Sequence, residues 1–176
     1  MAGSLIKIDE KIASNDASIT LGGSNWDSSY DVYMVRVNNM QFVTDNTSLG
    51  MRVLASSSPK TTSDYDTAAK VLRSNAAFAN NALANYDRTY LTYIGGSNVA
   101  TESLNAVIYL FNMNNASEYS FFTIEQSILD PYTELRGLQG GGVLKSAEAT
   151  QGIKYYTNTG LTDFTGGKFK LYGLKK

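Results

Sequence analysis

The sequence predicts an all-β fold: an antiparallel β-sandwich of jelly-roll type, with about nine strands in a single domain over residues 1–176. Three observations predict this fold. Apolar and polar residues alternate with a period of two in many short runs, and clusters of Gly, Asn, Ser and Asp separate those runs. Almost no segment has the pattern of a crossover helix, which parallel strands would need and antiparallel strands do not.

The alternation locates the strands. The run 104–111 turns four apolar residues to one face and sets Val107, Tyr109 and Phe111 opposite them. The last run places Phe169 and Leu171 on one face and polar residues on the other, as in a half-buried strand. The predicted strands cover residues 5–8, 17–21, 30–42, 49–54, 89–94, 104–111, 119–127, 152–156 and 168–174.

Two segments between these runs have a different pattern. Residues 65–73 carry apolar side chains at helical spacing after a capping Ser63 or Asp64, which predicts one short helix. The Ala- and Asn-rich stretch 74–85 has no clear period, so we expect a long excursion there. Residues 131–142, which end in three consecutive glycines, predict a second loop.

Composition excludes several classes of function. The chain has no Cys and no His, which removes disulfides, thiol nucleophiles, zinc–thiolate sites and the commonest general base. A net charge of −1 gives no field to recruit nucleic acid or an anionic membrane. No apolar run approaches the length of about 20 residues that spans a bilayer. We therefore expect no cofactor, no nucleic-acid partner and no membrane partner.

Acidic residues give little support for a metal or catalytic site. Asp64 and Asp66, like Asp27 and Asp31, lie close in sequence and could offer oxygens to Ca²⁺, but the EF-hand spacing is absent and Asp is a common turn former. A glycosidase would need two convergent carboxylates, for which the candidates are Glu102, Glu125 and Glu134. Nothing in the sequence brings these three together. The glycine pairs lack the Gly-Lys-Ser/Thr ending of a phosphate loop.

Aromatic residues are the candidate contact residues. The chain holds 12 Tyr, 7 Phe and 1 Trp, most of them in predicted strands, where core and cross-strand packing explains them. Trp26 is different because it lies in a polar turn, where it either covers the end of the core or forms a platform for a sugar. Tyr65, Tyr86 and Tyr132 lie in or beside predicted loops and are the other candidates for stacking on a glycan.

Five segments of the chain form a distinctive set: residues 19–39, 44–54, 63–66, 108–112 and 167–174. These segments resemble the sequences of small virion proteins of tailed phages of marine bacteria, of the cyanophage and pelagiphage type. They are strand-and-turn patterns spread over nearly the whole chain. The resemblance implies a phage structural protein with a jelly-roll-like sandwich and without catalytic residues.

The first hypothesis is therefore a non-enzymatic virion protein: a capsid decoration (knob or cement) protein, or a tail or neck accessory subunit. The absence of heptads and repeats favours decoration over an elongated fibre. Its partners would be the major capsid or tail proteins, in many copies or as a homo-oligomer, in a virion assembled after synthesis in the host cytoplasm. The alternative is a carbohydrate-binding receptor-recognition domain, which uses Trp26, Tyr65, Tyr86 and Tyr132 to bind a host surface glycan. A glycan-degrading enzyme is a third, weaker hypothesis.

Overall fold

The computed structural model describes residues 4–75, 77–92, 96–157 and 163–175. Within them the chain is all-β, and one 3-10 turn, η1 (Ala100–Glu102), is the helical element. The strands are β1 (Leu5–Ile12), β2 (Ser18–Gly22), β3 (Tyr30–Phe42), β4 (Leu49–Ala55), β5 (Ser58–Pro59), β6 (Tyr65–Arg73), β7 (Phe78–Tyr86), β8 (Thr89–Tyr90), β9 (Leu104–Phe111), β10 (Ser120–Leu129), β11 (Leu135–Leu144), β12 (Gly152–Thr157) and β13 (Phe164–Lys175).

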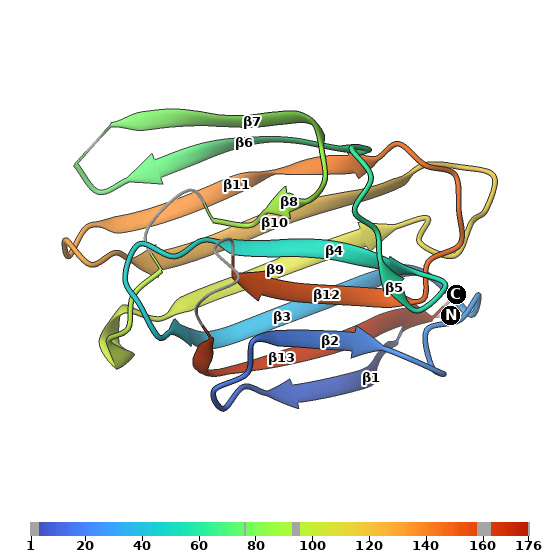
Figure 1. The fold of residues 1–176 in the computed structure, drawn as a ribbon, viewed down its shortest axis with the longest axis horizontal. Coiled ribbons are helices and arrows are strands. Elements are labelled where there is room, and N and C mark those ends of the chain that lie inside the picture. Colours follow the sequence, from blue (N-terminus) through green and yellow to red (C-terminus); the bar gives the residue numbers. More distant parts are fainter. Residues whose placement is uncertain (1–3, 76, 93–95, 158–162, 176) are drawn as a thin grey trace.

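The strands form two antiparallel sheets, which confirms the predicted sandwich. The large sheet has eight strands in the order β1-β13-β3-β9-β10-β11-β6-β7. The small sheet has the order β2-β12-β4-β5, and β8 also pairs with β4. Figure 1 shows the small sheet lying over the large one. No described helix is long and apolar enough to cross a membrane.

The core lies between the sheets and follows the predicted alternation. From the large sheet, Tyr33, Val35 and Ile108 are fully buried. From the small sheet, Met51 and Tyr155 meet them, also fully buried. Each strand alternates between this core and its other face because successive side chains of a strand point to opposite sides.

The predicted helix at 65–73 is wrong, because these residues form β6. Tyr65, Thr67, Ala69 and Val71 point to the core as every second residue, and β6 pairs with β11 on one side and β7 on the other. Two ladders of hydrogen bonds outweigh the moderate helix preference of the Ala, Lys and Leu residues.

The two predicted loops also contain strands. The Ala- and Asn-rich segment forms β7, a hairpin partner of β6, and the glycine-rich segment forms β11 between β10 and β6. All nine predicted strands have counterparts among the thirteen described; β5, β6, β7 and β11 were not predicted. The end of the predicted strand 89–94 lies outside the described residues.

Candidate functional site

One face of the large sheet packs on the small sheet, and the other is the open face. Its exposure is visible along β10, where Phe121, Thr123, Glu125 and Ser127 are exposed and the residues between them are mostly buried. An antiparallel sheet with one solvated face normally turns polar residues to water on that side. Departures from that rule on the open face are therefore informative.

The clearest departure is a row of apolar side chains across six neighbouring strands. Paired residues in an antiparallel ladder lie on the same face, so the register sets these side chains next to one another. Six strands at the usual spacing span about 24 Å. We call this set the apolar row; its members, in order from β1 to β11, are Leu5, Leu174, Val32, Phe111, Phe121 and Val143.

The apolar row reaches solvent. Leu5, Leu174 and Phe121 are 50%, 42% and 47% exposed. The next row along the strands adds Tyr109, 41% exposed, with Tyr172 and the more deeply placed Met34. This second row is apolar on β13, β3 and β9 and continues to Lys7 on β1 and Thr123 on β10. We call the apolar side chains of the two rows together the apolar band, which lies at the end of the sheet where β1 begins and β13 ends. An exposed apolar band of this kind is a candidate contact surface.

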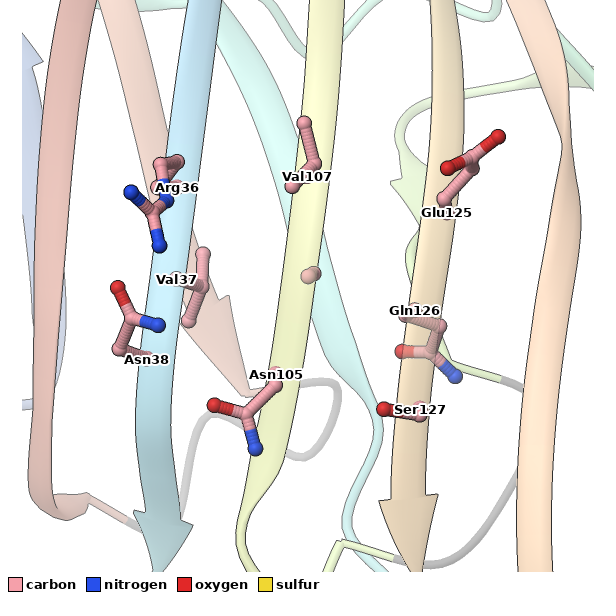
Figure 2. A pocket seen from close by; sticks show the side chains of 9 residues that line it. Arg36, Val37, Asn38, Asn105, Val107, Glu125, Gln126 and Ser127 are labelled. Atoms are coloured by element: carbon pink, nitrogen blue, oxygen red, sulfur yellow. The ribbon is translucent and has the colours of Figure 1, made fainter.

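Beyond the band the open face becomes polar. In the next row Arg36, Val107 and Glu125 are register partners on β3, β9 and β10. Figure 2 shows Val107 between the Arg36 and Glu125 side chains, with Asn105 in the following row. They line a shallow depression of about 390 Å³.

The Arg36 side chain forms no hydrogen bond or ion pair with any residue that the structure describes, whereas the Glu125 side chain accepts a 3.5 Å hydrogen bond from Gln139. An exposed guanidinium without a partner retains all its donors for an acceptor from outside the chain. The depression therefore offers one free cation, one carboxylate and several amide groups, but its walls are open and shallow.

Two of the predicted contact aromatics are part of the core. Trp26 is only 6% exposed and stacks on Tyr33, with ring centroids 4.0 Å apart. Trp26 therefore covers the end of the core and is not an exposed platform for a sugar. Tyr65 is fully buried, and its hydroxyl accepts a 3.1 Å hydrogen bond from the Val53 backbone. As the first inward residue of β6, Tyr65 is not available to a glycan, so that prediction is wrong.

Tyr132 and Tyr86 do reach the surface, at different places. Tyr132 is 70% exposed at the turn between β10 and β11, where the buried carboxylate of Asp130 accepts hydrogen bonds from the backbone N–H groups of Tyr132 and Glu134. Tyr86 lies at the far end of β7, because β7 begins opposite Leu72 and ends opposite Tyr65. The four predicted residues therefore do not form a single platform.

Tyr86 instead joins a cluster of aromatic rings and guanidinium groups. The Arg88 guanidinium lies 5.8 Å from the ring centres of Tyr86 and Tyr90 and 5.9 Å from that of Tyr156. Burial raises the pKa of Tyr156 to about 12. Asp87 forms ion pairs with Arg88 and Arg52, which links the β7–β8 connection to β4. The carboxylate, the two guanidinium groups and the ring faces contact one another within the fold, which indicates a structural cluster.

The acidic candidates are dispersed. Glu125 points out from β10, Glu134 forms an ion pair with Arg136, and Glu102 accepts a hydrogen bond from Ser97. A hydrogen bond from the Asn85 backbone N–H, together with the ion pair that Asp66 forms with Lys145, holds the pKa of Asp66 below its ordinary value. Among the described residues no group of three or more acids is arranged to hold a metal ion.

The sequence contained a signal for the apolar band. Val107, Tyr109 and Phe111 alternate with core residues on one strand, so that strand is apolar on both faces. A strand apolar on both sides is buried on both sides or contacts a partner. The open face of β9 is not fully buried in this chain, because Tyr109 is 41% exposed, so its apolar side chains are candidate contact residues.

Comparisons with known proteins add little. No protein-family model matches the sequence, and no curated protein matches it. A search of solved structures found a fructofuranosidase from Schwanniomyces occidentalis complexed with fructosylnystose, at 8% identity and a TM-score of 0.23. The match covers 98% of this chain but only 33% of that one. A likeness this weak carries no argument about fold or activity.

Proposed function

We propose that this chain is a non-enzymatic structural subunit of a tailed-phage particle, which attaches to a larger virion protein through the apolar band of its open face. The observation that carries this proposal is the apolar row. Six apolar residues from six strands lie side by side where a solvated sheet face would be polar. The resemblance to small marine phage virion proteins favours a phage particle as the partner, and the apolar band favours the open face as the surface of attachment.

The chemistry of the surface fits attachment better than catalysis. Phe121 and Tyr109 provide large apolar contact area with few rotatable bonds, which is typical of the centre of protein interfaces. If the particle carries many linked copies, their combined binding would be stronger than the modest affinity of each single contact. A compact sandwich that binds by one face suits a capsid decoration protein, and a tail or neck accessory position uses the same surface.

The first test is the composition of the particle. Virions of the phage that encodes this chain are purified on a density gradient and analysed by quantitative mass spectrometry. We expect the protein at a fixed ratio to the major capsid or tail protein. Intact virions that lack it would contradict the proposal.

The second test assigns the contact to the apolar band. Phe121→Asp places a charge within the apolar row, between Phe111 and Val143, which an apolar contact cannot accommodate without a large desolvation cost. We expect rebinding to particles stripped of the protein to fall by at least tenfold. Thr20→Asp is the control, because Thr20 is exposed on the small sheet. Equal binding of the two variants would show that attachment uses another surface.

A second candidate function is glycan binding, favoured by the polar depression rather than by the four predicted aromatic residues. Arg36, Asn105 and Glu125 offer donors and acceptors for sugar hydroxyls, and Tyr109 follows Val107 on the same face of β9 as a stacking surface. We expect Arg36→Ala to abolish a signal on a glycan array and Tyr132→Ala to preserve it. An array without any signal would exclude this candidate.

A further inference from the structure

The outer edge of the large sheet has an unusual composition at β7. β7 is the last strand of the sheet, and β6 is its one partner among the described strands. Its nine residues, Phe78–Tyr86, include no charged residue and no proline. One side of this strand therefore presents unpaired backbone N–H and C=O groups, and nothing in its own sequence discourages another strand from pairing there.

The other edges are protected. β1, at the opposite end of the large sheet, carries Lys7, Asp9, Glu10 and Lys11, and its register is shifted between Lys7 and Asp9. In the small sheet, β5 has two residues and β2 has five. Charge, a bulge and short length are the usual means by which natural sheets block edge pairing. β7 is the long edge of the described structure that has no such charge.

We propose that β7 pairs antiparallel with β7 of a second copy of this chain, which joins the two large sheets into one continuous sheet. A two-fold axis at the edge brings β7 against itself, so the pairing brings no like charges together. A second copy fits this edge because the edge is neutral throughout, and a neutral edge offers nothing to a charged partner strand. The net charge of −1 per chain adds little repulsion.

Side-chain size favours one register. Phe78 is 67% exposed on the open face at one end of β7. The residues around the other end of the regular ladder are small: Ala82 pairs with Ala68, which pairs with Gly141. If Phe78 lies opposite the partner's Ala82, its ring covers the partner's strip of small side chains. The two-fold axis repeats this contact, and it places Asn80 opposite Asn80 of the partner subunit.

This pairing has a consequence for attachment. Residues that pair across the axis have the same parity along the strand, so both open faces point to the same side. The dimer then presents two apolar rows in one plane, on a sheet of sixteen strands, eight from each copy. Two linked contact surfaces bind a repetitive surface more tightly than one. The dimer itself does not depend on the proposed virion role and can be tested in solution.

The first measurement is the mass of the full-length protein in solution by light scattering after size exclusion, over a series of concentrations. We expect a dimer that dissociates on dilution. In the proposed register, Ala82→Lys replaces the small side chain that Phe78 of the partner subunit covers by a long charged one, and the two-fold axis repeats this change, so we expect this variant to be monomeric with an unchanged circular dichroism spectrum. Thr20→Lys, on the small sheet, should remain dimeric. A monomeric wild type, or a dimer that survives Ala82→Lys, would overturn the proposal.

A cysteine variant tests the register. The chain has no Cys, so a single introduced thiol can form a disulfide only between two chains. Opposed residues of antiparallel strands lie within the Cα separation that a disulfide accepts. Under mild oxidation, Asn80→Cys should convert the dimer to a covalent dimer, and exposed Thr20→Cys should remain largely uncrosslinked. Equal crosslinking of both variants, or none of Asn80→Cys, would refute the register.

Discussion

At the scale of single residues, Asp87 connects two sheets through its charge. Hydrogen bonds from Arg88, and then the charges of Arg88 and Arg52, hold the pKa of Asp87 below its ordinary value of 3.8, against the opposing effect of burial. Arg88 in turn lies over Tyr86, Tyr90 and Tyr156. The carboxylate is therefore the centre of the contact between the β7–β8 connection and β4.

We predict a pH-dependent effect of Asp87→Asn. Because the folded-state pKa is lowered, the carboxylate stabilises the fold above its unfolded pKa, and this contribution is lost as pH falls through the folded pKa. At neutral pH the variant should lose about 1 kcal/mol, a modest value because the site is partly solvated. The difference from wild type, measured by urea unfolding, should vanish well below pH 3.8. A difference that stays constant with pH would rule out the charge as its cause.

At the scale of elements, β11 shows how a run of three glycines becomes a strand. A Cβ on Gly142 would lie 2.4 Å from the Phe122 ring and 2.3 Å from the carbonyl oxygen of Asp66. The aromatic ring from β10 and the backbone of β6 occupy the space that a side chain would need. Glycine is required there for close approach, although it weakens strands in general.

We predict that two alanine substitutions in β11 have unequal effects. Gly142→Ala forces the Phe122 ring and the β6 backbone apart and should cost about 1–3 kcal/mol of unfolding free energy. Gly137→Ala, in the same strand, meets its nearest neighbour at 3.4 Å and should change stability by less than about 0.5 kcal/mol. Thermal unfolding of both variants checks this. Equal losses of stability would show that any replacement of glycine destabilises this strand, whatever the packing around the position.

The strands differ in how far the sequence could predict them. β3, β9 and β13 alternate strongly and were predicted, because their inward side chains are large and apolar. β6 contains Ala, Lys and Leu, β7 is rich in Ala and Asn, and β11 is rich in Gly; the intrinsic preferences of these residues point to helix or turn. Pairing with neighbouring strands makes these three segments strands. A single sequence does not show which segments will be neighbours in the sheet.

The candidate site was predictable only in part. The outward apolar residues Val107, Tyr109 and Phe111 of β9 can be recognised from alternation alone. Their extension into a row cannot, because Leu5 and Val143 are neighbours of that row only through the strand order of the finished sheet. For Trp26 the sequence was misleading. Its polar neighbours in the sequence suggested an exposed side chain, but in the fold the indole is buried against Tyr33.

At the scale of the whole molecule, the strands nearest the two ends of the sequence are neighbours in the large sheet. Leu5 pairs with Leu174, and β13 lies between β1 and β3 with Phe169 and Leu171 fully buried. The closing strand is therefore an interior strand, and the core draws residues from both sheets into one cluster. Such a core should fold as one unit, whatever the order in which its strands are connected.

Circular permutation tests this directly. A short Gly-Ser linker joins the end of β13 to the start of β1, and new termini are opened between Ser117 and Glu118, both exposed in the β9–β10 turn. Because the cut breaks no ladder, we expect one cooperative thermal transition within a few degrees of wild type. The control opens the chain between Ile108 and Tyr109, inside β9, and should not fold. Two separate transitions in the first permutant would mean that the sheets fold as independent units.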